Sequence, residues 1–189
     1  MTVNNILIVG VGGQGTILAS RVLAAVIVQA GYEVKVSEIH GMAQRGGSVV
    51  TQVRWGERVF SPLVPLGAAG VVLAFEKLEA LRWLPWLRPG GQMLVNDQRI
   101  DPMPVLTGAA VYPEDALARL SAAGAAVTLC DGYALALRAG NAKAVNMVLL
   151  GLLSRHLEFP LSAWESALRR TAPEKYLAVN LAAFALGRD

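Results

Sequence analysis

The chain has 189 residues, of which 54% are hydrophobic and 16% charged, and its formal net charge is +3. This length is enough for one sizeable core, and so apolar a composition is typical of an α/β domain with both sheet faces covered, or of a subunit that buries surface against partners. The weak positive charge argues against a nucleic-acid partner, and the single cysteine, Cys130, excludes an internal disulfide and a cysteine-built iron–sulfur or zinc site.

The first predicted element is a buried strand over residues 6–9 that opens into glycines at GxGxxG spacing, and a helix over 16–30 follows. This order is the one that a dinucleotide-binding fingerprint requires. In that interpretation Gly10 allows a tight turn, Gly12 lets the backbone approach a phosphate, and Gly15 lets helix and strand pack closely. The start of the helix favours an anion there. The candidate cofactor-binding residues of this segment are Gly10, Gly12, Gly13, Gln14 and Gly15.

A second strand, predicted over residues 34–38, completes a βαβ opening. Its last residue, Glu38, lies 23 positions after Gly15, close to where a carboxylate meets a ribose hydroxyl in an NAD site. The same acid can equally be a solvated group at a strand end. Glu38 is therefore a further candidate for cofactor binding.

The loop over residues 40–47 is the second strong signal, because it follows the carboxyl end of a strand, where open α/β sheets bind ligands. Arg45 can present a guanidinium, and Gly46 and Gly47 free N–H groups, to a phosphate or carboxylate. A glycine pair is also an ordinary entry to a hairpin. The candidate binding residues of this loop are Gln44, Arg45, Gly46 and Gly47.

The rest of the chain predicts a doubly wound, Rossmann-like, mostly parallel α/β sheet within one domain over residues 1–189. Residues 48–54 form a strand that turns at 55–58 into 59–60, an antiparallel hairpin inserted into the parallel pattern. The C-terminal third is helical. The other predicted strands are 71–75, 93–96, 109–112 and 127–131, and the other predicted helices are 76–87, 114–123, 133–139, 142–156, 161–170 and 173–185.

No residue pattern predicts catalytic machinery or a metal site in this chain. His40 and His156 have no ligand partner at suitable spacing, so neither indicates a metal. Glu76 and Glu79 resemble a catalytic pair, but Glu76 suits a helix start and Glu79 an i,i+3 ion pair with Arg82. We therefore interpret both acids as structural.

The N-terminus carries no basic leader and its apolar stretch is interrupted by glycines, so no secretory signal is expected. The apolar run over residues 145–153 is too short to span a bilayer. We expect a soluble, intracellular protein of the cytoplasm without a membrane partner.

Two segments together, GVGGQGTILASRVLA and SEIHGMAQRGGSVVTQVR, resemble the gamma-type domain of the 2-oxoacid:ferredoxin oxidoreductases, and in particular the beta subunit of the indolepyruvate type. Further segments agree in order, among them VNDQRIDPMPV, YPED and GNAKAVNMVLLGLL, so the resemblance covers essentially the whole chain. The gamma subunits of pyruvate and 2-oxoglutarate enzymes share much of this pattern. It therefore indicates the family more specifically than the substrate.

The resemblance implies an enzyme of EC 1.2.7 type that decarboxylates a 2-oxoacid on thiamine diphosphate, passes electrons through iron–sulfur clusters to ferredoxin and releases an acyl-CoA. It places the thiamine diphosphate, Mg and 4Fe–4S clusters in a partner alpha subunit, which agrees with the single cysteine here. This chain is then expected to have no catalytic residue, to be inactive alone and to complete the assembly.

The same resemblance suggests that this chain lines the CoA side of the site. CoA has a diphosphate and a 3′-phosphate, which suit a glycine turn at a helix N-terminus together with Arg45. In one alternative the glycines only pack the backbone and the Gln44 loop docks on the alpha subunit, so that the chain is an assembly module. In another, supported by GxGxxG and Glu38, the chain is a freestanding NAD(P)-binding reductase or sensor domain.

Overall fold

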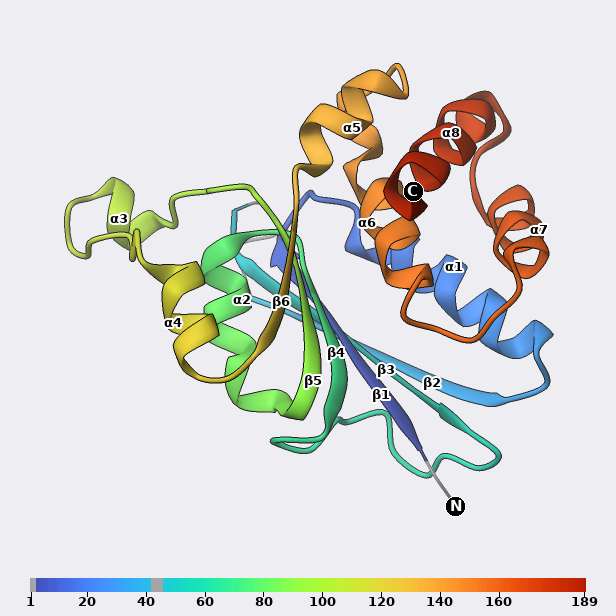
Figure 1. Ribbon diagram of the computed structural model, residues 1–189, viewed down its shortest axis with the longest axis horizontal. Coiled ribbons are helices and arrows are strands. Elements are labelled where there is room, and N and C mark those ends of the chain that lie inside the picture. Colours follow the sequence, from blue (N-terminus) through green and yellow to red (C-terminus); the bar gives the residue numbers. More distant parts are fainter. Residues whose placement is uncertain (1–2, 42–45) are drawn as a thin grey trace.

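The protein is built on a sheet with the strand order β2-β3-β1-β4-β5-β6, as the computed structural model of residues 3–41 and 46–189 describes it (Figure 1). The strands are β1 (Asn4–Val11), β2 (Glu33–His40), β3 (Ser48–Gly56), β4 (Ala69–Ala74), β5 (Leu87–Asn96) and β6 (Ala126–Cys130). The helices are α1 (Thr16–Gln29), α2 (Lys77–Trp83), α3 (Met103–Leu106), α4 (Ala116–Ala122), α5 (Gly132–Arg138), α6 (Val145–Ser154), α7 (Leu161–Thr171) and α8 (Leu177–Arg188). Short 3-10 turns are η1 (Leu84–Trp86), η2 (Ala142–Ala144) and η3 (Glu174–Tyr176).

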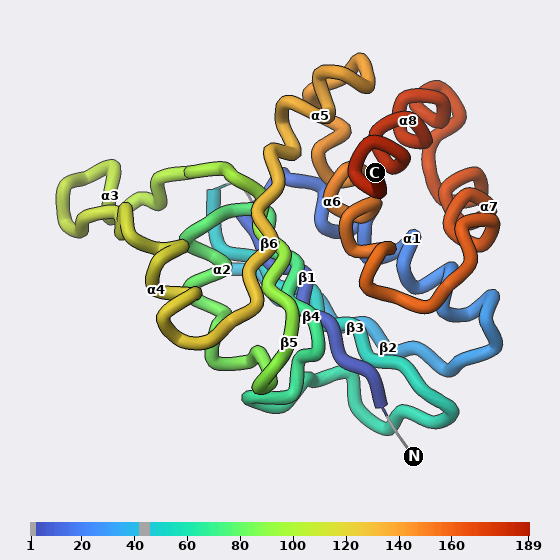
Figure 2. Tube along the Cα trace, in the orientation of Figure 1, coloured from blue at the N-terminus to red at the C-terminus, as the bar shows by residue number. Residues whose placement is uncertain are grey.

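Alternate residues of β1 enter two different cores. Ile6 and Ile8 pack with α1, α6, α7 and α8 on one face, whereas Leu7 and Val9 pack with α2 and α4 on the other. Successive side chains of a strand point to opposite faces, so a sheet covered on both sides needs an unbroken apolar run. The trace in Figure 2 shows these two groups of helices on either side of the sheet. The predicted buried strand and the α/β class are confirmed.

The antiparallel element of the sheet is β3, which lies between β1 and β2 and runs opposite to both. Its Val53 pairs with Ile6 of β1 on one side and with Val36 of β2 on the other. The inserted antiparallel strand is therefore confirmed, but its predicted hairpin partner, 59–60, is wrong. Seven of its nine residues are buried, because β3 is an interior strand, and β2 is its hairpin partner.

Two other predicted elements differ from the structure. The helix predicted over 76–87 ends at Trp83, where Pro85 enters a 3-10 turn because proline has no N–H for a continuing helix. The strand predicted over 109–112 is absent from the described residues. There the Ala110 N–H donates to the Pro104 carbonyl at 2.9 Å and closes a loop after α3 instead of pairing with a strand.

The C-terminal third is helical, as predicted, and α6 and α8 form its closest helix pair (Figure 1). The two backbones approach each other at Gly151 and Gly187, both of which are buried. None of the described helices is both long and apolar enough to cross a membrane.

Candidate functional site

The glycine turn and the segment that precedes β3 lie side by side at the carboxyl edge of β1. The Gly12 N–H donates to the Gly47 carbonyl at 2.8 Å, and the Gly46 N–H donates to the Gly12 carbonyl at 3.4 Å. Gln44 and Arg45 lie outside the described residues, so their predicted role stays a prediction. The Gly12 N–H is already used within the protein, but Gly12 also lines the cavity beside the turn, so the approach of its backbone to a phosphate stays a prediction.

Gly10 and Gly15 are required by the side chains that pack on them. A Cβ on Gly10 would lie 2.8 Å from Gln14 Oε1, and one on Gly15 would lie 2.7 Å from Asn146 Nδ2. Gly10 lies inside β1 without a positive φ, so its interpretation as the residue of a tight turn is wrong. The left-handed residues of the turn are Gly13, with φ 102°, and Gly15, with φ 83°.

The side chain of Gln14 is engaged by protein groups. Its Oε1 accepts from the Val11 N–H at 2.7 Å, and its Nε2 donates at 3.0 Å to both the Phe75 carbonyl and Gln98 Oε1. Both amide hydrogens are thereby used. Any contribution of Gln14 to binding therefore comes from holding the turn.

A cavity of about 430 Å³ lies beside this turn, at the N-terminus of α1. The first N–H groups of an α-helix have no acceptor inside the helix, so the start of α1 presents hydrogen-bond donors and a positive dipole end at this place. The cavity brings the glycine turn, Glu38 and His40 together. It is lined by Gly12, Gly13, Gly15, Thr16, Ile17, Glu38, His40 and Val49.

The position of Glu38 differs from that of the acid in a dinucleotide-binding fold. In that fold the second strand is the neighbour of the first, whereas here β3 separates β2 from β1. Neighbouring strands lie roughly 5 Å apart, so the interposed β3 places Glu38 roughly 10 Å from β1, twice the distance in a dinucleotide-binding fold. The exposed Glu38 therefore lines the cavity from β2, and Thr51 of β3 lies between it and Ile8 of β1 in the register of the sheet.

A second cavity, of about 300 Å³, lies on the α2 side of the turn and contains two buried carboxylates. Glu76 caps α2 by accepting from the Glu79 N–H at 3.0 Å. Glu79 in turn accepts from Arg82 Nε at 3.1 Å and from the Ser48 hydroxyl. The predicted helix-opening role of Glu76 and the Glu79–Arg82 pair are confirmed, and both acids have structural partners.

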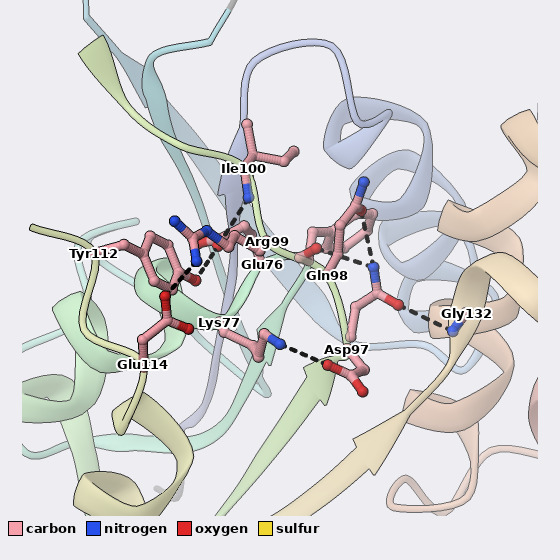
Figure 3. A network of polar contacts seen from close by, with 11 residues as sticks. Glu76, Lys77, Asp97, Gln98, Arg99, Ile100, Tyr112, Glu114 and Gly132 are labelled. Atoms are coloured by element: carbon pink, nitrogen blue, oxygen red, sulfur yellow. Dashed lines mark hydrogen bonds and ion pairs between the residues drawn. The ribbon is translucent and has the colours of Figure 1, made fainter. Parts of the chain in front are cut away.

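Tyr112 completes this cluster and was missed by sequence reasoning, which placed it in a strand. Its hydroxyl donates to Glu76 Oε1 at 2.5 Å, and the Ile100 N–H donates to the same oxygen at 3.2 Å (Figure 3). Burial raises the pKa of Tyr112 well above its ordinary value, and the hydrogen bond to the Glu76 carboxylate adds to this. The Arg99 guanidinium lies 4.4 Å from the centre of the tyrosine ring. Through these hydrogen bonds to Glu76, the segment after β5 is held against the start of α2.

The remaining candidate side chains have local surroundings. Cys130 ends β6 in a half-buried position, and burial raises the pKa of its thiol. His40 Nδ1 lies 3.2 Å from the carbonyl of the next residue, Gly41. Within residues 3–41 and 46–189 no three acidic, histidine or cysteine side chains are grouped as a metal site would require.

Residues 5–189 match the family described as pyruvate ferredoxin/flavodoxin oxidoreductase. The chain belongs to this family. Its similarity to curated members extends over nearly the whole chain. The indolepyruvate oxidoreductase subunit IorB of Thermococcus kodakarensis is 43% identical, over 97% of this chain and 93% of its own. The subunit of the same name from Archaeoglobus fulgidus is 38% identical, over 97% of this chain and 92% of its own.

Solved structures of the family share the fold at lower identity. Pyruvate oxidoreductase subunit PORC from Thermotoga maritima matches with a TM-score of 0.74 and 22% identity, over 100% of this chain and 96% of that one. A 2-oxoglutarate:ferredoxin oxidoreductase from Magnetococcus marinus, solved with 2-oxoglutarate, coenzyme A and succinyl-CoA bound, matches with a TM-score of 0.73 and 23% identity, over 100% of this chain but only 31% of that chain. The family, the fold class and the assignment to an oxidoreductase subunit are thus confirmed.

Proposed function

We propose that this chain is the subunit without thiamine or iron–sulfur sites in an arylpyruvate:ferredoxin oxidoreductase, with indolepyruvate as the main substrate. The names of relatives at 38–43% identity support this substrate. The partner alpha subunit holds thiamine diphosphate, Mg and the 4Fe–4S clusters, since one cysteine cannot bind a four-cysteine cluster. The oxoacid loses CO₂, its electron pair passes through the clusters to ferredoxin, and the acyl group is transferred to CoA.

The role of this chain in that reaction is to hold part of CoA. The observation that supports it is the cavity of about 430 Å³, in which the N-terminus of α1 meets the glycine turn. Helix N-termini with free N–H groups bind phosphate oxygens, and CoA presents a diphosphate and a 3′-phosphate. The N–H groups of Gly13, Gly15 and Thr16 are the donors proposed for these oxygens. Gln44 and Arg45 precede the Gly46 backbone, which contacts the turn, and are proposed to add to the same site.

Charge substitutions at Glu38 test this site. Glu38 lines the cavity, so its carboxylate repels phosphates bound there. In the assembled complex, Glu38→Gln is expected to lower the KM for CoA about threefold and Glu38→Lys about tenfold, which corresponds to about threefold for each unit of charge near a partly solvated surface. The measurement is CoA-dependent viologen reduction at saturating oxoacid. Glu57→Lys is the matched control, because Glu57 is exposed and directly follows β3, at the end of that strand away from the cavity. This variant leaves the KM unchanged.

The NAD(P) alternative predicts the opposite result for the same residue. A ribose needs the carboxylate of Glu38 as a hydrogen-bond acceptor, so Glu38→Gln would weaken NADH binding by the chain. An increase of the KM for CoA in both Glu38 variants would contradict phosphate binding at this cavity.

A further inference from the structure

We propose that Gln14 and Asn96 are positioning residues that set the glycine turn for CoA binding. This inference rests on the proposed function. Neither side chain lines the cavity beside the turn. Both act through other groups, because together they connect the turn after β1 to the ends of β4, β5 and β6.

The two side chains share the same pair of acceptors. Gln14 Nε2 donates to the Phe75 carbonyl and to Gln98 Oε1, each at 3.0 Å, and Asn96 Nδ2 donates to the same two oxygens, each at 3.1 Å. Asn96 Oδ1 accepts from the Gly132 N–H at 3.0 Å, at the start of α5 (Figure 3). Each amide group thus uses both of its hydrogens and its oxygen inside the protein.

Glycines make room for this network at both ends. A Cβ on Gly10 would lie 2.8 Å from Gln14 Oε1, and a Cβ on Gly132 would lie 2.7 Å from Asn96 Oδ1. Two glycines of the chain are therefore explained by amide side chains rather than by a ligand. Asn96 is 1% exposed, so an unpaired amide group there would be costly.

The network also lies where a doubly wound fold ordinarily binds its ligand. From β1 the chain continues to β2, on one side of β1 in the sheet, whereas from β4 it continues to β5, in the opposite direction across the sheet. The topological switch point, where these directions diverge, therefore lies between β1 and β4. Gln14 crosses this point from the turn to the Phe75 carbonyl. The amides therefore support the turn at the switch point, and the cavity of about 430 Å³ lies beside the turn at the N-terminus of α1.

Replacement of an amide by the isosteric acid removes only the donors. In Gln14→Glu the carboxylate still accepts from the Val11 N–H, but it repels the Phe75 carbonyl and Gln98 Oε1, which then face another acceptor. The turn shifts, and the N–H groups that face the cavity lose their alignment. We expect the KM for CoA to rise about tenfold, with kcat at saturating CoA within about twofold of the parent, because the thiamine chemistry takes place in the partner subunit.

Matched variants separate positioning from folding. Gln29→Glu makes the same change at an exposed glutamine whose side-chain oxygen accepts from Arg170, and it leaves the KM for CoA unchanged. Gln98→Ala removes one acceptor from each amide and raises the KM about threefold, and because position 98 is partly exposed the change disturbs folding less than Gln14→Glu. If Gln14→Glu does not assemble into the complex, Gln98→Ala decides the question.

The outcomes distinguish the two proposals. An increase of the KM for CoA in Gln14→Glu and Gln98→Ala with kcat retained supports the positioning role. If Glu38→Lys lowers the KM but the two amide variants leave it at the parent value, the CoA site stands and the positioning role is refuted. If neither Glu38→Lys nor Gln14→Glu changes the KM, CoA does not bind at this cavity and both proposals fail.

Discussion

Replacement of Gly187 by Ala is expected to lower the free energy of unfolding by about 3 kcal/mol or more, the upper range for overpacking a core. A Cβ on Gly187 would lie 1.9 Å from the Val148 carbonyl oxygen, and one on Gly151 would lie 2.1 Å from the Phe184 carbonyl oxygen. Both obstacles are helix backbone, which no rotamer change can move. Helices α6 and α8 must separate to admit the methyl group, and the apolar contacts between them weaken.

Chemical denaturation of the full chain, followed by circular dichroism, measures this loss. For a domain of this size, about 3 kcal/mol corresponds to roughly 6–12 °C in Tm. Gly151→Ala is expected to give a loss of similar size, and the double variant less than the sum, because either substitution already separates the helices. Ala185→Ser, exposed on the same helix, is the control. A Gly187→Ala protein as stable as this control would contradict the close crossing of α6 and α8.

The second large effect is expected for Gly15→Ala at the N-terminus of α1. Its φ of 83° costs an L-residue about 1–2 kcal/mol, and the new Cβ would lie 2.7 Å from Asn146 Nδ2, in a buried position, which adds about 1–2 kcal/mol. Gly13 provides the matched comparison, because it also has a positive φ but its Cβ would meet nothing within 4 Å. Gly13→Ala is therefore expected to cost only the backbone strain.

The two contributions are separated by a third variant. In Gly15→Ala/Asn146→Ala the clash is removed and the strain remains, so the alanine at position 15 costs no more in that background than Gly13→Ala costs in the parent chain. If Gly13→Ala and Gly15→Ala lowered the free energy of unfolding equally, the Asn146 side chain would not be in close contact with Gly15.

The sequence predicted most of the fold because the signals were local. Apolar runs such as 6–9 and 71–75 indicate strands buried on both faces, and the run of helical periodicity after Gly132 indicates the C-terminal helices. The partners of β3 could not be predicted from such local signals. Its apolar residues suit an interior strand, but whether it pairs with residues 59–60 or with β1 and β2 depends on contacts distant in sequence.

The sequence predicted which residues of the candidate site lie near one another better than it predicted their individual contacts. The glycine turn, Gly47 and Glu38 do come together at the carboxyl edge, which follows from the topology of a βαβ unit. The roles of Gly10 and Gly12 could not be predicted, because they depend on Gln14 and on the Gly47 carbonyl. Such partners become neighbours only in the folded chain.

The insertion of β3 also bears on the NAD(P) alternative. The fingerprint glycines have the correct spacing, yet the Gly12 N–H is occupied and Glu38 lies one strand further from the turn than in a dinucleotide fold. The glycines and Glu38 therefore have the spacing of the fingerprint along the sequence, but Glu38 does not have the expected position across the sheet. Both differences count against the NAD(P) alternative.

The most direct test of the proposed function is anaerobic purification of the tagged chain from its own host, with an assay of CoA-dependent viologen reduction on indolepyruvate, phenylpyruvate, pyruvate and 2-oxoglutarate. The proposed function predicts a larger partner that contains iron and thiamine diphosphate, and the highest kcat/KM on indolepyruvate. A chain that purifies alone, reduces no viologen with any oxoacid and binds NADH saturably would contradict it.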